Sequence, residues 1–318
     1  MLLLKSNKIE MILFFLLLLP VVLSGQIPNH TYPRIAIWQW EGAVPDWYAR
    51  FDLAYTRIGS RTGGGDKGFI DEARRLNPNI IWLPTDDFNC AQTILPNTPN
   101  EWYVVDSKGN RLGVGYCPGG GMADLSDLCP RVNGQRLIDV LPGYLADLVA
   151  EYGVEGFASD GLYSQEHYAW NKWGGDVDLD RNGVNDLDEH GLSWALQHWG
   201  NGVEKLVSEL RARIGDDKVI MINPGNILHI KQWINGYVDE FGGGVLDWSS
   251  QRRTIDLMRQ VRQPPIFLLQ SAPDDRDPRT PDVSKNYLSY MRYTLMQSML
   301  LGKYYTFDDV DNKDPNHY

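Results

Sequence analysis

Eight short apolar or β-branched runs, separated by amphipathic stretches, constrain the fold of this 318-residue chain more than any other feature. The runs are RIAIWQW (34–40), FDLAYTRIG (51–59), NIIWLPTDDF (79–88), GVEGFASDGLY (153–163), KVIMINPGN (218–226), GYVDEFGGG (236–244), PPIFLLQSA (264–272) and GKYYTFDDV (302–310). Helical periodicity lies between several of them, most clearly at 137–148 and 192–210. Strands that alternate with helices form parallel sheets, and eight such units close a barrel. The sequence therefore predicts a (β/α)8 TIM barrel.

An open, doubly wound sheet is the alternative fold. It is disfavoured because no Gly-rich phosphate-binding turn follows the first run, and because polar residues stand at the carboxyl end of nearly every run. There is no internal repeat or low-complexity linker, so residues 26–318 are predicted to form one domain, with a long third connection at 89–132. The chain stops soon after the eighth run, and we expect the closing helix of the barrel to be missing.

The first 25 residues have the layout of a secretory signal peptide. Two lysines precede an apolar run at 11–23, and the small residues Ser24 and Gly25 follow it. A membrane anchor is the alternative, but the run is short for the roughly 20 residues that span a bilayer. We therefore expect cleavage near residues 24–26 and a secreted or periplasmic protein that has no membrane contact after cleavage.

The chain has three cysteines, Cys90, Cys117 and Cys129, and their expected state depends on whether the chain is exported. In an exported protein an odd number predicts one disulfide and one free thiol. Closeness in sequence favours a pair between Cys117 and Cys129, although spacing alone does not determine the pairing. None of the three has the spacing of metal ligands.

The charge and the aromatic content of the chain limit its partners. A net charge of -11, with no conspicuous cluster of Lys or Arg, argues against a nucleic-acid partner. The 11 Trp and 16 Tyr residues offer flat rings on which the apolar faces of sugars can stack. The composition therefore mildly favours a carbohydrate ligand, and it leaves the oligomeric state open.

An acidic segment follows the fourth run. Residues 178–189 satisfy the calcium-loop pattern D-x-[DN]-x-[DN]-G-x5-E. A hard cation takes about six to eight oxygen ligands, which alternate side chains, one backbone carbonyl and a final bidentate Glu supply. The predicted ligands are Asp178, Asp180, Asn182, Val184 through its carbonyl, Asp186 and Glu189. No helical pattern precedes the loop, so we expect a lone structural Ca2+ site; the alternative is a solvated acidic turn.

Active sites of such barrels form at the carboxyl ends of the strands. There the sequence places amides, indoles, one arginine and several carboxylates: Trp38, Trp40, Arg57, Asp86, Asp87, Asp160, Asn223, Asp239, Glu240, Gln270 and Asp308. This set contains no His-rich metal site, and Arg57 is its one basic residue for a phosphate. Carboxylates that flank a scissile bond, with amides that bind hydroxyls, are typical of glycosidases.

The fourth run also carries a resemblance to a family. GVEGFASDGLY, preceded by DLSDLCPRVNGQRLIDVLPGYLADLV and followed by the acidic loop, resembles the bacterial glycoside-hydrolase-like barrels labelled glycosyl hydrolase-like family fifteen. The resemblance spans residues 34–310, and its motifs are short. Related barrels of the α-galactosidase and α-glucosidase groups carry an Asp nucleophile after strand four and an acid/base carboxylate after strand six. The endo-α-galactosaminidase barrels, with Asp and then Glu at these places, are similar.

The resemblance implies that Asp160 is the nucleophile and Glu240 the acid/base. Asp239 is the alternative acid, because the α-glucosidase pattern has Asp at that place. A retaining enzyme needs one carboxylate kept ionised and a second whose pKa is raised. We expect desolvation beside Phe241 to raise the pKa of Glu240.

The functional expectation is an exported, calcium-stabilised glycoside hydrolase that acts on an α-linked poly- or oligosaccharide. Its substrate-binding residues would be Trp38, Trp40, Arg57, Asp86, Asp87, Asn223, Gln270 and Asp308. A non-catalytic, calcium-stabilised glycan-binding barrel is the alternative. A lyase that acts on acidic sugars is a third possibility, but more cationic residues would be expected at its rim.

Overall fold

The computed structural model confirms the barrel. It describes residues 27–39, 44–57, 66–88, 90, 95, 97–113, 121–162, 174–223, 229–240, 248–271 and 287–307. The strands are β1 (Ala36–Gln39), β2 (Leu53–Thr56), β3 (Ile81–Asp87), β4 (Gly156–Asp160), β5 (Val219–Ile222), β6 (Gly236–Asp239), β7 (Leu268–Ser271) and β8 (Tyr304–Phe307). They pair in parallel in chain order. A parallel bridge between Ile35 and Tyr305 brings β8 beside the start of β1 and closes the ring.

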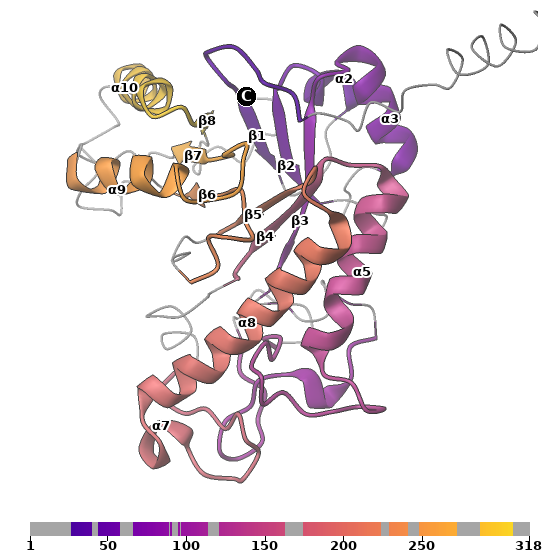
Figure 1. Cartoon of the computed structure of the whole chain (residues 1–318), viewed down its shortest axis with the longest axis vertical. Helices are drawn as coiled ribbons and strands as arrows, with labels where there is room; N and C mark the ends of the chain where they lie inside the picture. Colours follow the sequence, from indigo (N-terminus) through magenta and orange to yellow (C-terminus); the bar gives the residue numbers. More distant parts are fainter. Residues whose placement is uncertain are drawn as a thin grey trace, which may run out of the picture.

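Helices lie between the strands, as the periodicity predicts. They are α2 (Pro45–Tyr48), α3 (Lys67–Leu76), the 3-10 turn η1 (Asn100–Trp102), α5 (Leu137–Tyr152), α7 (Asp186–Glu189), α8 (Leu192–Ile214), α9 (Trp248–Met258) and α10 (Tyr287–Leu300). The two longest, α5 and α8, run side by side (Figure 1). Among the described residues no helix is long and apolar enough to cross a membrane. The predicted signal peptide and the expected lack of a closing helix concern residues outside the described ranges.

Alternate residues of each strand face two different apolar cores. The inner core of the barrel consists of Ala36, Leu53, Tyr55, Ile81, Leu83, Ala158, Val219, Met221, Val238, Ile266, Leu268 and Tyr304. Strand residues at the intervening positions, such as Trp82, Phe157 and Ile220, join the larger outer core with the helices. Because strand side chains alternate between faces, this pattern also decides which residues at the carboxyl ends point into the mouth of the barrel.

The connections after β3 and β4 pack on each other beyond the barrel. The amide of Asp178 donates to the carbonyl of Val105, and Ser107 donates to the carboxylate of Asp176 through both its amide and its hydroxyl. In Figure 1 these connections lie with α7 at the end of α5 and α8 that is far from α9 and α10. The predicted calcium loop is therefore part of an extension built from two connections.

The cysteines differ from the expected pairing. Cys129 is a buried free thiol, and Cys90 is disulfide-bonded. The predicted pair between Cys117 and Cys129 is therefore wrong. Closeness in sequence misled because the backbone at Cys129 turns its side chain into the outer core, where burial raises the pKa of the thiol. Cys117 itself lies outside the described residues.

Candidate active site

The alternation of strand side chains decides which of the predicted catalytic acids face the mouth of the barrel. On β4, Ala158 belongs to the inner core, so Asp160, two residues later, faces the same side. On β6, Val238 belongs to the inner core, and Glu240 therefore continues that face. Asp239 shares the opposite face with Tyr237. The alternation thus separates two neighbouring acids that the sequence pattern alone treats as alternatives.

The same rule applies to the two acids that end β3. Leu83 belongs to the inner core, so Asp87 faces the mouth and Asp86 faces outward. Asp87 is almost fully buried, at 4% exposure, which fits a side chain that points into the mouth. The carboxylate of Asp86 instead accepts the backbone amide of Asp87 at 2.9 Å. Of the two predicted substrate-binding acids on β3, only Asp87 therefore faces the mouth of the barrel.

Asn223, at the end of β5, joins the carboxylates of β4 and β6. Its Nδ2 donates to Oδ1 of Asp160 at 2.9 Å and to Oε2 of Glu240 at 2.8 Å. Two oxygens held by one nitrogen at these distances can be no more than about 5.7 Å apart, the sum of the two bonds. Asn223 is fully buried, so it is a fixed donor that holds both carboxyl groups. Three of the predicted site residues are therefore in direct contact.

The environment of Asp160 favours its protonated form. Burial raises the pKa of Asp160 to about 8, with further contributions from the negative charges of Asp87 and Glu240. Hydrogen bonds from the amide of Gly161 and from Asn223 oppose this shift by stabilising the carboxylate. Glu240, by contrast, is exposed. A proton is therefore expected on Asp160 at neutral pH.

Asp239 has a different partner. Its Oδ2 accepts from Nζ of Lys303 at 2.7 Å, and the lysine side chain is fully buried while Asp239 is partly exposed. A buried ammonium group needs a counter-charge, because an unpaired charge in the interior is strongly unfavourable. Asp239 is thus bound in a structural ion pair, on the strand face opposite to that of Glu240.

Aromatic side chains line the inner face beneath these acids. The rings of Trp38 and Tyr55 lie with their centroids 4.7 Å apart, and Trp38 packs against the inner core. Tyr55 is fully buried, and its pKa is raised well above the usual value by burial first and then by the charge of Asp160. Sequence reasoning missed Tyr55 because it considered only the last residues of each run. Tyr55 stands two residues before Arg57 and therefore on the same strand face, which could have indicated that its ring lies near the predicted site.

The remaining predicted residues divide into two groups. Gln270 is buried and follows Leu268 of the inner core by two residues, so it faces the mouth. Arg57 continues the face of Tyr55 and is partly buried. Trp40 and Asp308 lie outside the described residues. The structure therefore brings Trp38, Arg57, Asp87, Asp160, Asn223, Glu240 and Gln270 to one end of the barrel.

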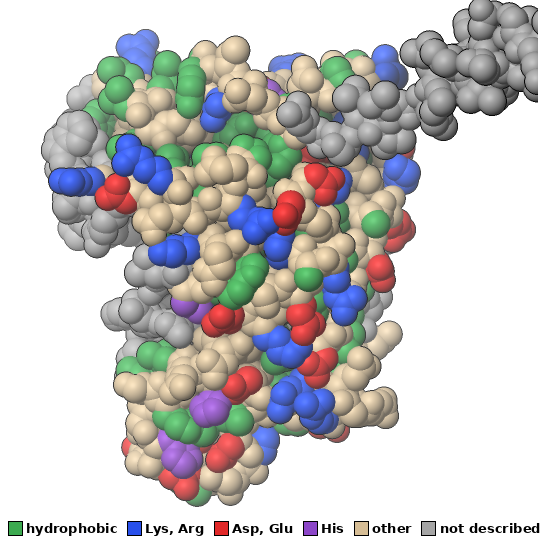
Figure 2. All heavy atoms as spheres, viewed as in Figure 1, with side chains coloured by type: hydrophobic (Ala, Val, Ile, Leu, Met, Phe, Trp, Pro, Cys, Tyr) green, Lys and Arg blue, Asp and Glu red, His purple; other side chains and the backbone are tan. Residues whose placement is uncertain are grey.

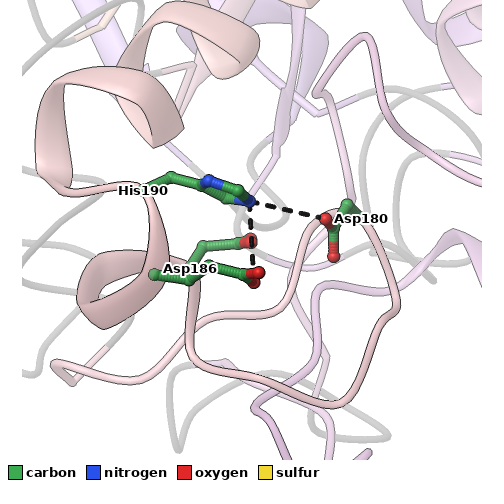
Figure 3. Close-up of side chains that lie close together, drawn as sticks. Asp180, Asp186 and His190 are labelled. Carbon is green, nitrogen blue, oxygen red and sulfur yellow. Dashed lines mark ion pairs between the residues drawn. The ribbon is translucent and has the colours of Figure 1, made fainter.

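The acidic loop at 178–189 lies apart from these residues and is folded on itself. Asp178 accepts the backbone amides of Asn182 and Gly183, each at 3.0 Å. Gly183 has φ +83°, a conformation that favours glycine, which explains the glycine of the pattern. Side-chain atoms of Asp180, Asp186, Glu189 and His190 all lie within 4.8 Å of one another. Figure 3 shows Asp180, Asp186 and His190 pointing toward a common centre, and in Figure 2 acidic and histidine side chains gather at this end of the molecule.

Comparison with known proteins yields structural similarity only. No family model matches the sequence, so the resemblance to glycosyl hydrolase-like family fifteen stays a prediction. No curated protein matches it either. A noncanonic maltogenic α-amylase, AmyB from Thermotoga neapolitana, is 12% identical, with 86% of this chain and 67% of that chain covered and a TM-score of 0.45. A chitinase from Rhizomucor miehei is 12% identical over 89% of this chain and 95% of that chain, with a TM-score of 0.44. An intracellular xylanase from Thermoanaerobacterium saccharolyticum is 9% identical over 86% and 84%, with a TM-score of 0.37. Similarity at this level assigns neither a family nor a substrate to this chain.

Proposed function

We propose that the chain is a glycoside hydrolase that cleaves O-glycosidic bonds with the pair Asp160 and Glu240. The observation that carries the proposal is that Asn223 donates to both carboxyl groups at the mouth of the barrel. Oδ1 of Asp160 and Oε2 of Glu240 are therefore no more than about 5.7 Å apart. Retaining glycosidases hold their two carboxyl groups roughly 5–5.5 Å apart, and inverting enzymes roughly 6.5–9.5 Å. The short separation supports a retaining double displacement.

The raised pKa of Asp160 and the exposure of Glu240 suit the two carboxyl groups to different roles. Because the pKa of Asp160 is raised to about 8, Asp160 holds the proton at neutral pH and is proposed as the general acid. Glu240, exposed and facing the mouth, is proposed as the nucleophile. This assignment reverses the roles that the family resemblance implies, and it follows from the burial of Asp160.

The reaction then has two steps. Glu240 attacks the anomeric carbon while Asp160 gives its proton to the departing glycosidic oxygen, which forms a glycosyl ester on Glu240. Asp160, now a carboxylate, takes a proton from water, and the water oxygen displaces Glu240 from the sugar. Asn223 donates to both carboxyl groups and so holds them close to each other. Trp38 offers a ring for stacking at the same end of the barrel.

We further propose that the substrate is an α-linked poly- or oligosaccharide, as the family resemblance implies. The inward amides of Asn223 and Gln270 and the inward carboxylate of Asp87 are suited to hydroxyl groups, which both donate and accept hydrogen bonds. A screen of purified protein against a panel of polysaccharides identifies the substrate. Binding without cleavage of any member would favour the glycan-binding barrel instead.

Substitution of each carboxyl group tests the roles on a substrate that is cleaved. Asp160→Asn should lower turnover of the natural substrate by about 10²–10⁴-fold, since a general acid contributes that much. It should retain most turnover of aryl glycosides with activated leaving groups, which depart without a proton. Glu240→Gln should lose both activities, because an amide cannot form the glycosyl ester. Asp147→Asn, an exposed position on α5, is the matched control and should behave as the wild type.

The same experiment can contradict the proposal in two ways. If Glu240→Gln shows the dependence on leaving group and Asp160→Asn loses both activities, the roles are those that the resemblance implies. If neither variant changes turnover, the pair does not perform the reaction.

A further inference from the structure

The loop at 178–189 has the contacts of a folded cation loop, and these are independent of the proposed hydrolase site. Oxygens of Asp178 hold the turn at Asn182 and Gly183, while Asn182 contacts two of the other acids. Its Nδ2 donates to Oδ2 of Asp180 at 3.2 Å and to Oε2 of Glu189 at 2.7 Å. Rotation of this amide by half a turn would direct its oxygen at the same centre. The loop thus converges carboxylate and amide groups on one point.

Asp186 supplies a second, separate observation. Its side chain is fully buried, at 0% exposure, and its Oδ1 has no hydrogen-bond partner among the described residues, while Oδ2 accepts the amide of Leu179. A buried carboxylate oxygen without a partner is strongly unfavourable unless a cation or a donor meets it. Asp186 also belongs to the cluster with Asp180 and Glu189, so its buried carboxylate lies where the other acids converge. Figure 3 shows the carboxylate of Asp186 directed at that cluster.

The loop is also anchored to the connection after β3. The guanidinium group of Arg181, the loop's fourth residue, donates to the carbonyl of Tyr103 and to Oδ2 of Asp124, both at 2.7 Å. Asp124 is fully buried, so the ion pair is fixed in the extension. The amide of Asp178 donates to the carbonyl of Val105 at 2.9 Å. Tyr103, Val105 and Asp124 therefore contact the loop directly.

We propose that residues 178–189 bind a calcium ion and that this ion fixes the connection after β4 to the connection after β3. Side-chain oxygens of Asp178, Asp180, Asn182 and Glu189, the carbonyl of Val184 and the carboxylate of Asp186 are the ligand set. Oxygen ligands of this number suit a hard cation, whereas zinc prefers a few nitrogen and sulfur ligands. His190 lies at the edge of the cluster, with Nε2 3.7 Å from Asp180 and 3.6 Å from Glu189, and is not required as a ligand.

Terbium luminescence tests the binding site without any enzyme assay. Tb3+ prefers oxygen ligands as Ca2+ does, and its emission is sensitised by a nearby indole. The ring of Trp194 lies 4.2 Å from the ring of His190, next to the cluster. Tb3+ added to the purified full chain should give saturable emission on excitation of tryptophan, and Ca2+ should displace it. Trp194→Phe should reduce the emission strongly while Ca2+ still raises the melting temperature.

Matched substitutions in the loop distinguish the side chains that bind the ion from neighbours that do not. Asp180→Asn and Glu189→Gln should each lower the affinity for Tb3+ and Ca2+ by at least about tenfold, because each removes a charged ligand from the site. Asp188→Asn removes a neighbouring carboxylate of α7 that accepts from Nδ2 of Asn185 and is not in the cluster, so the affinity should be unchanged. His190→Gln should also leave the affinity unchanged. The calcium assignment is overturned if Asp180→Asn keeps wild-type affinity, or if Zn2+ displaces Tb3+ at lower concentration than Ca2+ and His190→Gln abolishes that displacement.

Hydrogen exchange tests the link between the two connections. Ca2+ should slow exchange of backbone amides in the loop and also at residues 103–107, where the amide of Ser107 donates to Asp176. Arg181→Gln should still bind Tb3+, but Ca2+ should then slow exchange mainly within the loop. If Ca2+ binds the wild type and leaves exchange at 103–107 unchanged, the ion does not fix one connection to the other.

Discussion

Asp160 keeps its proton to a much higher pH in the folded chain than in the unfolded chain. Its pKa is raised from 3.8 to about 8 by burial first, and then by Asp87 and Glu240. Stability that depends on this proton is fully present below about pH 4 and is lost as the pH rises through about 8, because the unfolded chain releases the proton first. One proton of this kind changes the free energy of unfolding by at most about 1.4 kcal/mol per pH unit. Between pH 5 and pH 8, the wild type should therefore lose stability relative to Asp160→Asn.

Urea unfolding of both proteins at several pH values measures this difference. The control is Asp147→Asn, which makes the same change of residue at an exposed position on α5. Parallel pH dependences for the wild type and Asp160→Asn would contradict the raised pKa of Asp160.

At the residue scale, the sequence predicted which kinds of side chain meet at the mouth but not which of two neighbours faces it. The sequence predicted both Asp86 and Asp87 at the site and kept Asp239 as the alternative to Glu240, and only the inner core fixed the phase of each strand. A shift of one residue exchanges the two faces, and runs that are buried on both faces carry no polar alternation that would reveal the phase. The ion pair of Asp239 with Lys303 depends on two strands that are far apart in sequence, so no local pattern could predict it.

At the scale of elements, α8 lies so close to the connection after β3 that only glycine fits at one position. A Cβ atom built on Gly202 would lie 1.8 Å from the carbonyl oxygen of Leu125. Gly143 on α5 is the matched control, because its Cβ would meet nothing nearer than Nη1 of Arg213 at 3.8 Å. Gly202→Ala should therefore lower the free energy of unfolding by about 1–3 kcal/mol or more. Gly143→Ala should raise it by about 0.5–1 kcal/mol, because alanine is the better helix former.

Chemical denaturation of the two variants provides the measurement. Equal effects of the two substitutions would mean that α8 does not pack against Leu125 as described. The comparison separates the contact from helix propensity, since both glycines lie inside long helices.

The predicted runs contain all eight strands, yet every strand is shorter than its run. GVEGFASDGLY, for example, yields the five-residue strand β4. Composition marks a buried segment, whereas strand ends depend on where the neighbouring strand still offers hydrogen-bond partners. Helices α5 and α8 follow the predicted periodicity closely because each buries one stripe along its full length.

At the scale of the whole molecule, the alternation of strands and helices was sufficient to predict the barrel. Parallel pairing in chain order follows from the tendency of consecutive strands to lie side by side and from the handedness of each strand-helix-strand unit. The packing of the connections after β3 and β4 was not predictable, because Arg181 meets Asp124 across 57 residues of sequence. The predicted disulfide between Cys117 and Cys129 was wrong for the same reason, since closeness in sequence does not measure closeness in space.

The export of the whole chain is the last prediction, and the layout of residues 1–25 and the disulfide at Cys90 support it. Expressed with its own N-terminus in a host that exports proteins, the mature chain should begin near Gln26, as N-terminal sequencing measures. Leu17→Arg, which interrupts the apolar run, should keep the chain inside the cell with Met1 intact. After denaturation without reductant, the exported chain should show one reactive thiol, that of Cys129, and after reduction all three cysteines should react. Recovery of the wild type in the membrane fraction with Met1 intact would instead show that the apolar run is an anchor.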